Sequence, residues 1–368
     1  MTKKILVTSD KFKGSVTAAD ACRLIGKGIR KSFPDYEIWT HPIADGGDGS
    51  IEVLCAYMPC ETISVLTEDP LGRSITAEYV ISNKTAFIEI AAASGFVLLA
   101  DDERDPLLTS TYGTGILVKD ALCRDIGEVV FLLGGSATND AGLGIAAALG
   151  FIFSDTHGNA IKPNGGNLQS ITHISNPAAF AAKFTFLTDV DNPFYGEEGA
   201  AFVYGPQKGA SPAAVQALDV GLRNVASLIM EKYGLDLQTV KGAGAAGGIA
   251  GGLSPLLNGE IKNGFDTLST VTGLEQKLAE ADVVISGEGK LDRQSLRGKV
   301  VGKLASLCSK YDKDLHIIAG TNELTRKECE AMGIRSVLAV REIAASLPDA
   351  IKNAPSYIEQ LGANLNLR

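Results

Sequence analysis

The two ends of the chain share an alternation of short apolar runs with segments of helical period. In the segment 17–33, Leu24 and Ile25 lie on one helical face, and Thr17 is a residue type that often begins helices. The apolar runs of strand length are KILVTS (4–9), YEIWTHPIA (36–44), ADVVISGEG (281–289), DLHIIAGT (314–321) and RSVLAV (335–340). Strands that alternate with helices predict an open parallel α/β sheet, here built from both ends of the chain.

The period changes after about residue 60, which marks a domain boundary. Three β-rich runs within 61–95 are separated by DPLG and SNKT, a pattern typical of antiparallel strands. The next predicted elements are the strands EVVFLLGG (128–135) and KFTFLT (183–188) and the amphipathic helix SPAAVQALDVGLRNVASLIMEKYG (211–234). We therefore expect two α/β domains, one formed by 1–60 with 281–368 and a mixed α/β domain inserted at 61–280.

Composition excludes several classes of protein. Of 368 residues, 45% are hydrophobic, and the net charge of −9 does not suit nucleic acid or an anionic membrane, which both need a positive field. The six cysteines and four histidines show no metal-site spacing, so we expect buried thiols in a reducing compartment. No apolar run approaches the ~20 residues of a membrane span. These features predict a soluble, cytoplasmic protein.

Six loops combine glycine with hydroxyl, amide or carboxylate side chains. They are SDKFKGS (9–15), ADGGDGS (44–50), GGSATND (134–140), DVDNP (189–193), GAGAAGG (242–248) and SGEGKLD (286–292). A single such loop is most simply a tight turn before a helix. Four follow an apparent strand, and exposed N–H groups at such positions bind anionic oxygens. Six together indicate a polyanion with a divalent cation.

Side chains in these loops supply both donors and charge. Ser136, Thr138 and Asn139 can donate to phosphate or substrate oxygens, whereas Asp140 either holds Mg²⁺ through water or caps the following helix. The lysines within the glycine-containing motifs are Lys11, Lys13, Lys208, Lys290 and Lys299. Solvated surface positions explain most of these lysines, and motif residues on both sides favour Lys13 and Lys290 as functional.

The run GAGAAGG also matches the dinucleotide fingerprint GxGxxG, through Gly242, Gly244 and Gly247. Two further glycines and Pro255 follow where that fingerprint needs a strong helix, and close backbone packing explains the glycines equally well. An NAD-dependent oxidoreductase remains an alternative on this match alone. P-loop and protein-kinase motifs do not occur in the sequence.

Taken in order, the loops resemble the bacterial glycerate kinase family. The matching segments are DKFKGSVTA, ADGGDGS, TYGTG, LLGGSATNDAGLGIAAALG, DVDNP, GPQKGA, GAGAAGG and SGEGKLDRQSLRGK, and they cover essentially residues 1–300. Ala141 and Phe194 replace an expected Gly and Leu, and Ile116 stands where an acidic residue is common. The resemblance implies a two-domain α/β fold with a flavodoxin-like part. It also implies ATP and Mg²⁺ as co-substrates, with D-glycerate in an interdomain cleft, typically phosphorylated at its 2-hydroxyl.

Roles within this reaction are assigned from chemistry. Asp189, at a strand end, is the expected general base, and Lys13 and Lys290 are expected to stabilise the transferring phosphoryl group. The expected Mg²⁺ ligands are Asp45, Asp48, Asp191 and Asp292. The expected substrate and phosphate contacts are Lys11, Ser15, Gly134, Gly135, Ser136, Thr138, Asn139, Gly287 and Gly289. A kinase of another small sugar acid or polyol and a non-catalytic nucleotide-binding regulator stay as alternatives.

Overall fold

The chain folds into two compact units. The computed structural model describes residues 2–293, 295 and 300–367, so Lys299 and the end of the motif SGEGKLDRQSLRGK lie outside the described residues. Unit 1 comprises Met1–Asp45, Glu52–Tyr57 and Gly264–Arg368, and unit 2 comprises Gly46–Ile51 and Met58–Asn263. This division differs from the expected one at 46–51, 58–60 and 264–280. Residues 264–280 group with unit 1 because they form the helices that lead into its third strand.

Unit 1 is built on a five-stranded sheet from both chain ends. Its strands are β1 (Lys4–Val7), β2 (Glu37–Thr40), β12 (Val283–Leu291), β13 (Asp314–Asn322) and β14 (Ile334–Ala339). Every pairing is parallel, and the spatial order is β14-β13-β12-β1-β2. This is the flavodoxin-like order, in which the strand order reverses beside β1. The five strands expected from the sequence are confirmed.

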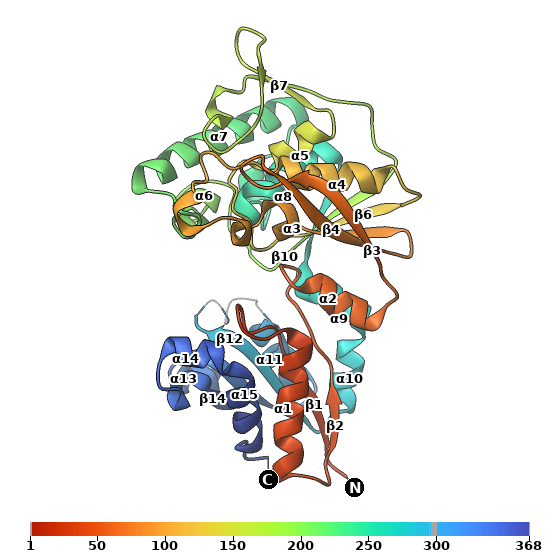
Figure 1. Ribbon diagram of the computed structural model, residues 1–368, viewed down its shortest axis with the longest axis vertical. Helices are drawn as coiled ribbons and strands as arrows, with labels where there is room; N and C mark the ends of the chain where they lie inside the picture. The colour runs from red at the N-terminus through yellow and green to blue at the C-terminus, as the bar shows by residue number, and fades with distance from the viewer. Residues whose placement is uncertain (1, 294, 296–299, 368) are drawn as a thin grey trace. The chain divides into compact units, whose positions relative to one another are not determined.

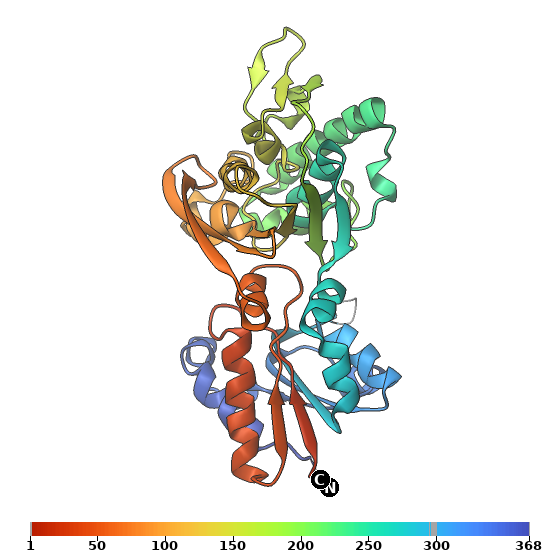
Figure 2. The ribbon, with the colours of Figure 1, turned by 90° about the vertical axis from the view of Figure 1, so that its right-hand side faces the viewer.

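Helices cover both faces of this sheet. One face carries α1 (Ala18–Ser32) and α15 (Ala354–Ala363), and the other carries α10 (Leu274–Glu280) and α11 (Val300–Lys310) (Figures 1 and 2). The Thr17 side chain accepts a hydrogen bond from the Asp20 N–H, which confirms the expected helix start. A Cβ at Gly28 would lie 2.1 Å from the Glu359 carbonyl oxygen, so glycine permits the close approach of α1 and α15. The remaining helices of this part are α2 (Ser50–Tyr57), α9 (Gly264–Thr272), α12 (Arg326–Ala331), α13 (Val340–Ile343) and α14 (Leu347–Lys352).

Unit 2 contains a mixed six-stranded sheet in the order β11-β10-β6-β5-β4-β3. Its strands are β3 (Glu61–Glu68), β4 (Ser74–Ser82), β5 (Thr85–Glu89), β6 (Glu128–Leu132), β10 (Lys183–Thr188) and β11 (Glu260–Asn263). The β3-β4-β5 pairings are antiparallel, as expected, whereas β5, β6, β10 and β11 are parallel. The carboxyl ends of these four strands therefore meet at one edge. A small antiparallel sheet of β7 (Ile152–Ser154), β8 (Ala160–Ile161) and β9 (His173–Ser175) was not predicted.

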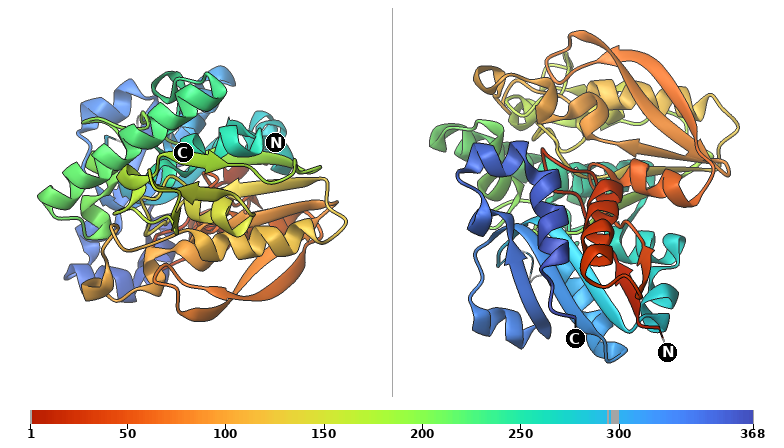
Figure 3. Two further views of the ribbon diagram at one scale, coloured as in Figure 1. Left: turned by 90° about the horizontal axis from the view of Figure 1, so that it is seen from above. Right: turned by 60° about the horizontal axis from the view of Figure 1, so that its bottom comes forward.

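The helices of unit 2 pack around one large apolar core. They are α3 (Ala91–Ser94), α4 (Tyr112–Leu122), α5 (Leu143–Ala148), α6 (Ala200–Tyr204), α7 (Pro212–Tyr233) and α8 (Ala245–Leu257). Short 3₁₀ turns are η1 (Phe96–Leu98), η2 (Asp101–Glu103), η3 (Leu168–Ser170), η4 (Pro206–Lys208) and η5 (Leu237–Thr239). The gold helix α4 runs along the orange β3-β4 ribbon (Figure 3). Ser211 begins α7 and Gly234, at φ +68°, ends it, as its sequence predicted.

The expectation that glycines and Pro255 oppose a helix after GAGAAGG was wrong. Ala246, Gly247 and Gly248 have positive φ, and the chain then continues as α8 through Pro255. Its glycines permit tight packing: a Cβ at Gly252 would lie 2.2 Å from the Ala141 carbonyl oxygen. Close packing against the β6-α5 segment therefore outweighs the poor helix propensity of these residues.

Three cysteines differ from the expectation of buried thiols, because Cys55 and Cys60 are not free and the thiol of Cys123 is exposed. Cys22, Cys123, Cys308 and Cys329 are free, but Cys55 and Cys60 are disulfide-bonded. Since this pair has no CxxC spacing, no motif marked it.

Among the helices of the described residues, none has the length and hydrophobicity needed to cross a membrane.

Candidate active site

The β6 loop (134–140) follows β6 and leads into α5 through a tight backbone turn. Gly135, Ala141 and Gly142 have positive φ, the conformation that such a turn requires. A Cβ at Gly134 would lie only 2.7 Å from the Asp48 backbone nitrogen. Glycine at this position therefore lets the 46–50 loop approach the β6 loop. Both loops belong to unit 2, and Asp48 lies beside Gly134 and Gly135.

Asp140 connects the starts of two helices. Its carboxylate accepts hydrogen bonds from the Thr111 N–H at 2.7 Å and the Thr111 hydroxyl at 2.8 Å, just before α4. It also accepts from the N–H groups of Gly142 and Gly144, at 3.1 and 3.3 Å, at the start of α5. Burial raises the pKa of this carboxyl, and these hydrogen bonds oppose the rise. Of the two roles left open for Asp140, the helix cap is confirmed.

Lys208 lies beneath the β6 loop with only 3% of its surface exposed. Its Nζ donates to the Ser136 hydroxyl at 2.9 Å and to the Thr138 carbonyl at 2.6 Å. Burial lowers the pKa of Lys208 to about 7, and the charge of Asp140 partly opposes that shift. The motif GPQKGA drew attention to Lys208, but the surface interpretation given to it there was wrong, because the lysine is buried and fixes the loop.

The same loop buries polar groups that lack a protein partner. Asn139 is fully buried, and neither its Nδ2 nor its Oδ1 has a hydrogen-bond partner among the described residues. The Thr138 hydroxyl shares this property. An unsatisfied buried amide costs about 1–3 kcal/mol, so natural proteins usually keep one where a ligand or water completes it. Asn139 thus offers a donor and an acceptor together.

The β10 end lies directly beside the β6 loop. Leu132 pairs with Leu187 in parallel register, and the Leu133 N–H donates to the Leu187 carbonyl at 3.1 Å. The loops that begin at Gly134 and Asp189 therefore leave the same edge of one sheet. Burial and the charge of Asp189 together raise the pKa of the nearby Tyr204 hydroxyl. That hydroxyl donates to the Asn192 side chain at 2.6 Å, while Asp191 is exposed.

The run GAGAAGG packs its backbone against both loops. A Cβ at Gly244 would lie 2.2 Å from the Pro193 carbonyl oxygen, and one at Gly247 would lie 2.1 Å from the Thr138 carbonyl oxygen. The run follows the 3₁₀ turn η5 and not a strand, so the structural context of a dinucleotide fingerprint is absent. Close backbone approach explains these glycines, and the oxidoreductase alternative loses its basis.

In unit 1, the loop after β1 (9–15) lies against β12. The Asp10 N–H donates to the Gly287 carbonyl at 3.0 Å, and a Cβ at Gly289 would lie 3.1 Å from the Lys13 backbone nitrogen. The loop that carries Lys11, Lys13 and Ser15 therefore packs against the strand that carries Gly287 and Gly289. Since β1 and β12 flank the point where strand order reverses, this edge is where α/β sheets of this order bind ligands.

Carboxylates gather at this edge of unit 1. Burial and the neighbouring charge of Asp45 raise the pKa of Asp10 to about 8, and Glu288 adds to the rise. Asp10 and Glu288 both lie in loops that the sequence singled out, yet neither was assigned a role. The sequence signal that could have identified them is an acidic residue next to a lysine, as at Asp10, or between glycines, as at Glu288.

Lys290 and Asp292 are brought together near the carboxyl end of β12. The Lys290 Nζ lies 3.1 Å from the Glu323 carboxylate and 3.5 Å from that of Asp292. The lysine side chain is 54% exposed. Ion pairs as exposed as these contribute only about 0–1 kcal/mol, so a phosphate could displace them at little cost.

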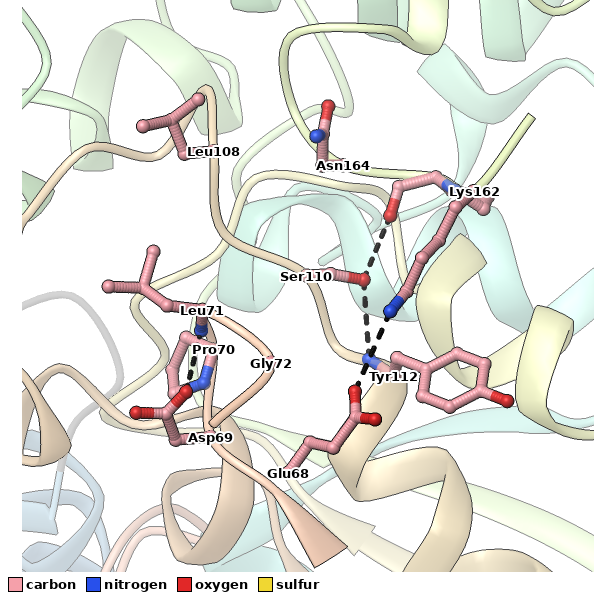
Figure 4. Close-up of a pocket in the computed structure, with 11 residues that line it drawn as sticks. Glu68, Asp69, Pro70, Leu71, Gly72, Leu108, Ser110, Tyr112, Lys162 and Asn164 are labelled. Carbon is pink, nitrogen blue, oxygen red and sulfur yellow. Dashed lines mark hydrogen bonds and ion pairs between the residues drawn. The ribbon is translucent and has the colours of Figure 1, made fainter. Parts of the chain in front are cut away.

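A polar cavity in unit 2, of about 180 Å³, lies between the β3-β4 turn and residues 108–112 and 162–164 (Figure 4). Lys162 approaches the Glu68 carboxylate at 3.6 Å and lies 4.9 Å from the centre of the Tyr112 ring. Asp69 accepts from the Leu71 and Arg73 N–H groups, each at 2.9 Å. Because these charges are already paired, we assign this cavity no substrate.

Comparisons with known proteins agree with this arrangement of loops. The profile of the glycerate kinase family matches residues 5–367. Glycerate kinase of Halalkalibacterium halodurans and glycerate 2-kinase of Escherichia coli are each 37% identical, over 98% of this chain and 97% of theirs. A crystal structure assigned as glycerate kinase 2 from Salmonella typhimurium LT2 is 34% identical, with a TM-score of 0.80 over 99% of this chain and 97% of that one. The chain therefore belongs to the glycerate kinase family and is an ATP-dependent kinase.

Proposed function

We propose that this protein transfers the γ-phosphoryl group of ATP to the 2-hydroxyl of D-glycerate and releases 2-phosphoglycerate. Family membership supports glycerate as the acceptor, and the Escherichia coli relative carries the name glycerate 2-kinase. The observation that carries the proposal is the β6 loop beside fixed Lys208, where the buried Asn139 amide and the Thr138 hydroxyl have no hydrogen-bond partner within the described part of the chain. A small acid with oxygen on every carbon supplies both the acceptors and the donors that these groups need.

Within this proposal the strand-end loops of unit 2 bind the acceptor. Ser136, Thr138 and Asn139 contact oxygens of the substrate, and Gly134 and Gly135 let the backbone come close to them. Asp189 takes the proton of the attacking hydroxyl, a contribution typically worth 10²–10⁴-fold in rate. Its position after a buried strand supports the role, because a rigid strand end holds the carboxylate in place.

The loops of unit 1 contact the phosphates in the same proposal. Lys13 and Lys290 stabilise charge on the transferring group, and Lys11 and Ser15 bind neighbouring phosphate oxygens. A Cβ at Gly287 would lie 2.7 Å from the Ser9 hydroxyl and one at Gly289 3.1 Å from the Lys13 backbone nitrogen, so these glycines let the loop that carries Lys11, Lys13 and Ser15 pack against β12. Phosphoryl transfer depends mainly on positioning and electrostatic stabilisation, which is the contribution expected of such residues.

Mg²⁺ fits the donor chemistry of the acidic loops. Among residues 2–293, 295 and 300–367, no group of three or more His, Cys, Asp or Glu side chains is arranged to hold a metal ion alone. Mg²⁺ commonly needs only one or two carboxylates, with water and substrate phosphates completing its shell. We propose Asp45, Asp48, Asp191 and Asp292 as candidate ligands. Asp45 has particular support, since its charge acts on Asp10. Bound Mg²⁺ would neutralise phosphate charge.

Proton and phosphorus NMR of the product tests the proposal directly. Purified protein is incubated with ATP, Mg²⁺ and, in parallel reactions, D-glycerate, L-glycerate, glycerol or a four-carbon sugar acid. We expect D-glycerate to react fastest, with the phosphorus coupled to the single proton on carbon 2. Coupling to the two protons on carbon 3 would overturn the assigned position. Faster reaction of another acid or polyol would overturn the assigned acceptor.

A further inference from the structure

A pocket of about 160 Å³ lies in unit 1 beside the carboxyl ends of β12 and β13. We call it the α14 pocket, and its apolar lining comes from Phe12, Val340, Leu347, Ala350, Ile351 and Ala354. Leu347 and Ile351, on α14, are 55% and 48% exposed. Large apolar side chains gathered at the mouth of a pocket indicate a binding surface more often than isolated ones do.

The α14 pocket is lined from both sides of the point where the strand order of unit 1 reverses. Phe12, Lys13 and Ser15 belong to the loop after β1, and Gly289 belongs to the neighbouring strand β12. Gly320 and Thr321, at the end of β13, extend the lining on the β12 side. Open α/β sheets of this order bind nucleotide-like ligands in the crevice at this point.

The polar groups of the pocket suit a heteroaromatic ring with an anionic extension. The Arg341 Nη1 is buried and has no hydrogen-bond partner among the described residues. A guanidinium group both donates to ring nitrogens and stacks on flat rings. Lys13 and Ser15 lie on the same pocket, where Lys13 supplies a positive charge for phosphate oxygens and the Ser15 hydroxyl, which here donates to the Phe12 carbonyl at 3.0 Å, can turn toward them.

We propose that the α14 pocket binds the adenine ring of ATP, with the phosphates directed toward Lys13 and Ser15. The inference rests on the proposed function in one respect, the use of ATP as phosphoryl donor. The pocket is smaller than the roughly 300 Å³ of a site that encloses a whole drug-sized ligand, so it holds a ring system and not a complete nucleotide. Glycerate does not match the lining, because each of its carbons carries oxygen and six of the lining side chains are apolar.

Ile351→Asn tests this assignment, with Ile343→Asn as its matched control. Ile351 lines the pocket, whereas Ile343, on α13, is 39% exposed and is not among the lining residues. Both changes are neutral in charge and lie on the surface, so both variants should fold. We expect Ile351→Asn to raise the Kd of ATP in calorimetry by about tenfold, equivalent to roughly 1.4 kcal/mol. The glycerate KM and the inhibition constant of tripolyphosphate, which has no base, should stay at the parent values, and Ile343→Asn should match the parent.

Photolabelling gives a second readout that needs no variant. The parent protein is irradiated with 8-azidoadenosine triphosphate and digested, and the labelled peptides are identified by mass spectrometry. We expect label within the segments that line the pocket, 12–15, 320–321 or 340–354, and protection by excess ATP. Arg341→Met should reduce the labelling while leaving the glycerate KM unchanged.

The outcomes separate this inference from the proposed function. An unchanged Kd for ATP in Ile351→Asn, label outside the lining segments 12–15, 320–321 and 340–354, or a raised glycerate KM with normal ATP binding would each overturn the adenine assignment. A parent protein that binds ATP at this pocket but phosphorylates no glycerate would refute the proposed function and leave the adenine pocket standing.

Discussion

Replacing Lys208 with Met removes a buried amine from beneath the β6 loop while keeping most of its volume. The parent Nζ donates to the Ser136 hydroxyl and the Thr138 carbonyl, so the variant leaves both acceptors without their donor. A buried acceptor that loses its partner costs about 1–3 kcal/mol. We therefore expect Lys208→Met to be less stable than the parent at alkaline pH and to bind glycerate more weakly.

The size of the stability loss depends on pH in a direction that the structure fixes. Burial lowers the pKa of Lys208 to about 7 in the folded protein, whereas an unfolded lysine titrates near 10.4. Between these values the unfolded chain binds more protons, so the contribution of Lys208 to stability rises with pH. It is complete above about pH 10.4 and is lost as pH falls toward 7. The slope is on the order of 1 kcal/mol per pH unit.

Urea denaturation of the parent and the variant, between about pH 7 and 9.5, measures this effect. We expect the difference in unfolding free energy, parent minus variant, to grow with pH by roughly 2–3 kcal/mol over that range. Lys208→Arg serves as a second variant, because an arginine cannot lose its charge and should be destabilising throughout the range. A difference that stays constant or shrinks as pH rises would refute the claim that Lys208 is buried with a lowered pKa.

Three further variants test the loop geometry. Gly247→Ala should lower stability by more than about 2 kcal/mol in thermal denaturation, because its Cβ would lie 2.1 Å from the Thr138 carbonyl oxygen at φ +78°. Gly127→Ala, with open space around it, should be nearly neutral, and equal effects of the two would contradict the packing. Asp140→Asn should cost about 1–3 kcal/mol in urea denaturation, since two helix starts lose a charged acceptor; unchanged stability would remove its capping role. Asn139→Leu should raise the glycerate KM strongly without loss of stability, because the amide has no hydrogen bond to lose among residues 2–293, 295 and 300–367; a stability loss with normal KM would reverse that assignment.

Much of the architecture could be predicted because buried strands and amphipathic helices leave periodic patterns. The five strands of unit 1 and the helix α7 are of this kind, with Ser211 and Gly234 as local signals at the ends of α7. The path through Gly251, Gly252 and Pro255 could not be predicted, because α8 depends on tertiary packing against Ala141 and Phe194. Propensity describes the isolated segment and carries no information about such neighbours.

In the candidate site, too, part of the arrangement could be predicted from residue types and part depends on tertiary contacts. Residue types alone identified the β6 loop, because Ser136, Thr138 and Asn139 follow an apolar strand. Burial decided what each residue does, and burial depends on contacts between distant segments. Lys208 lies seventy-two positions from Ser136 along the chain, and its role became visible only through the hydrogen bond between them.

In the proposed mechanism the catalytic groups lie at the carboxyl ends of neighbouring strands, and Asp189 is the base. Turnover of Asp189→Asn at saturating ATP and D-glycerate tests it most directly, with thermal melting to show that the variant is folded. We predict a folded protein whose turnover falls at least about 100-fold, the smallest effect typical of a lost general base. A folded variant that keeps turnover within about tenfold of the parent would contradict the claim.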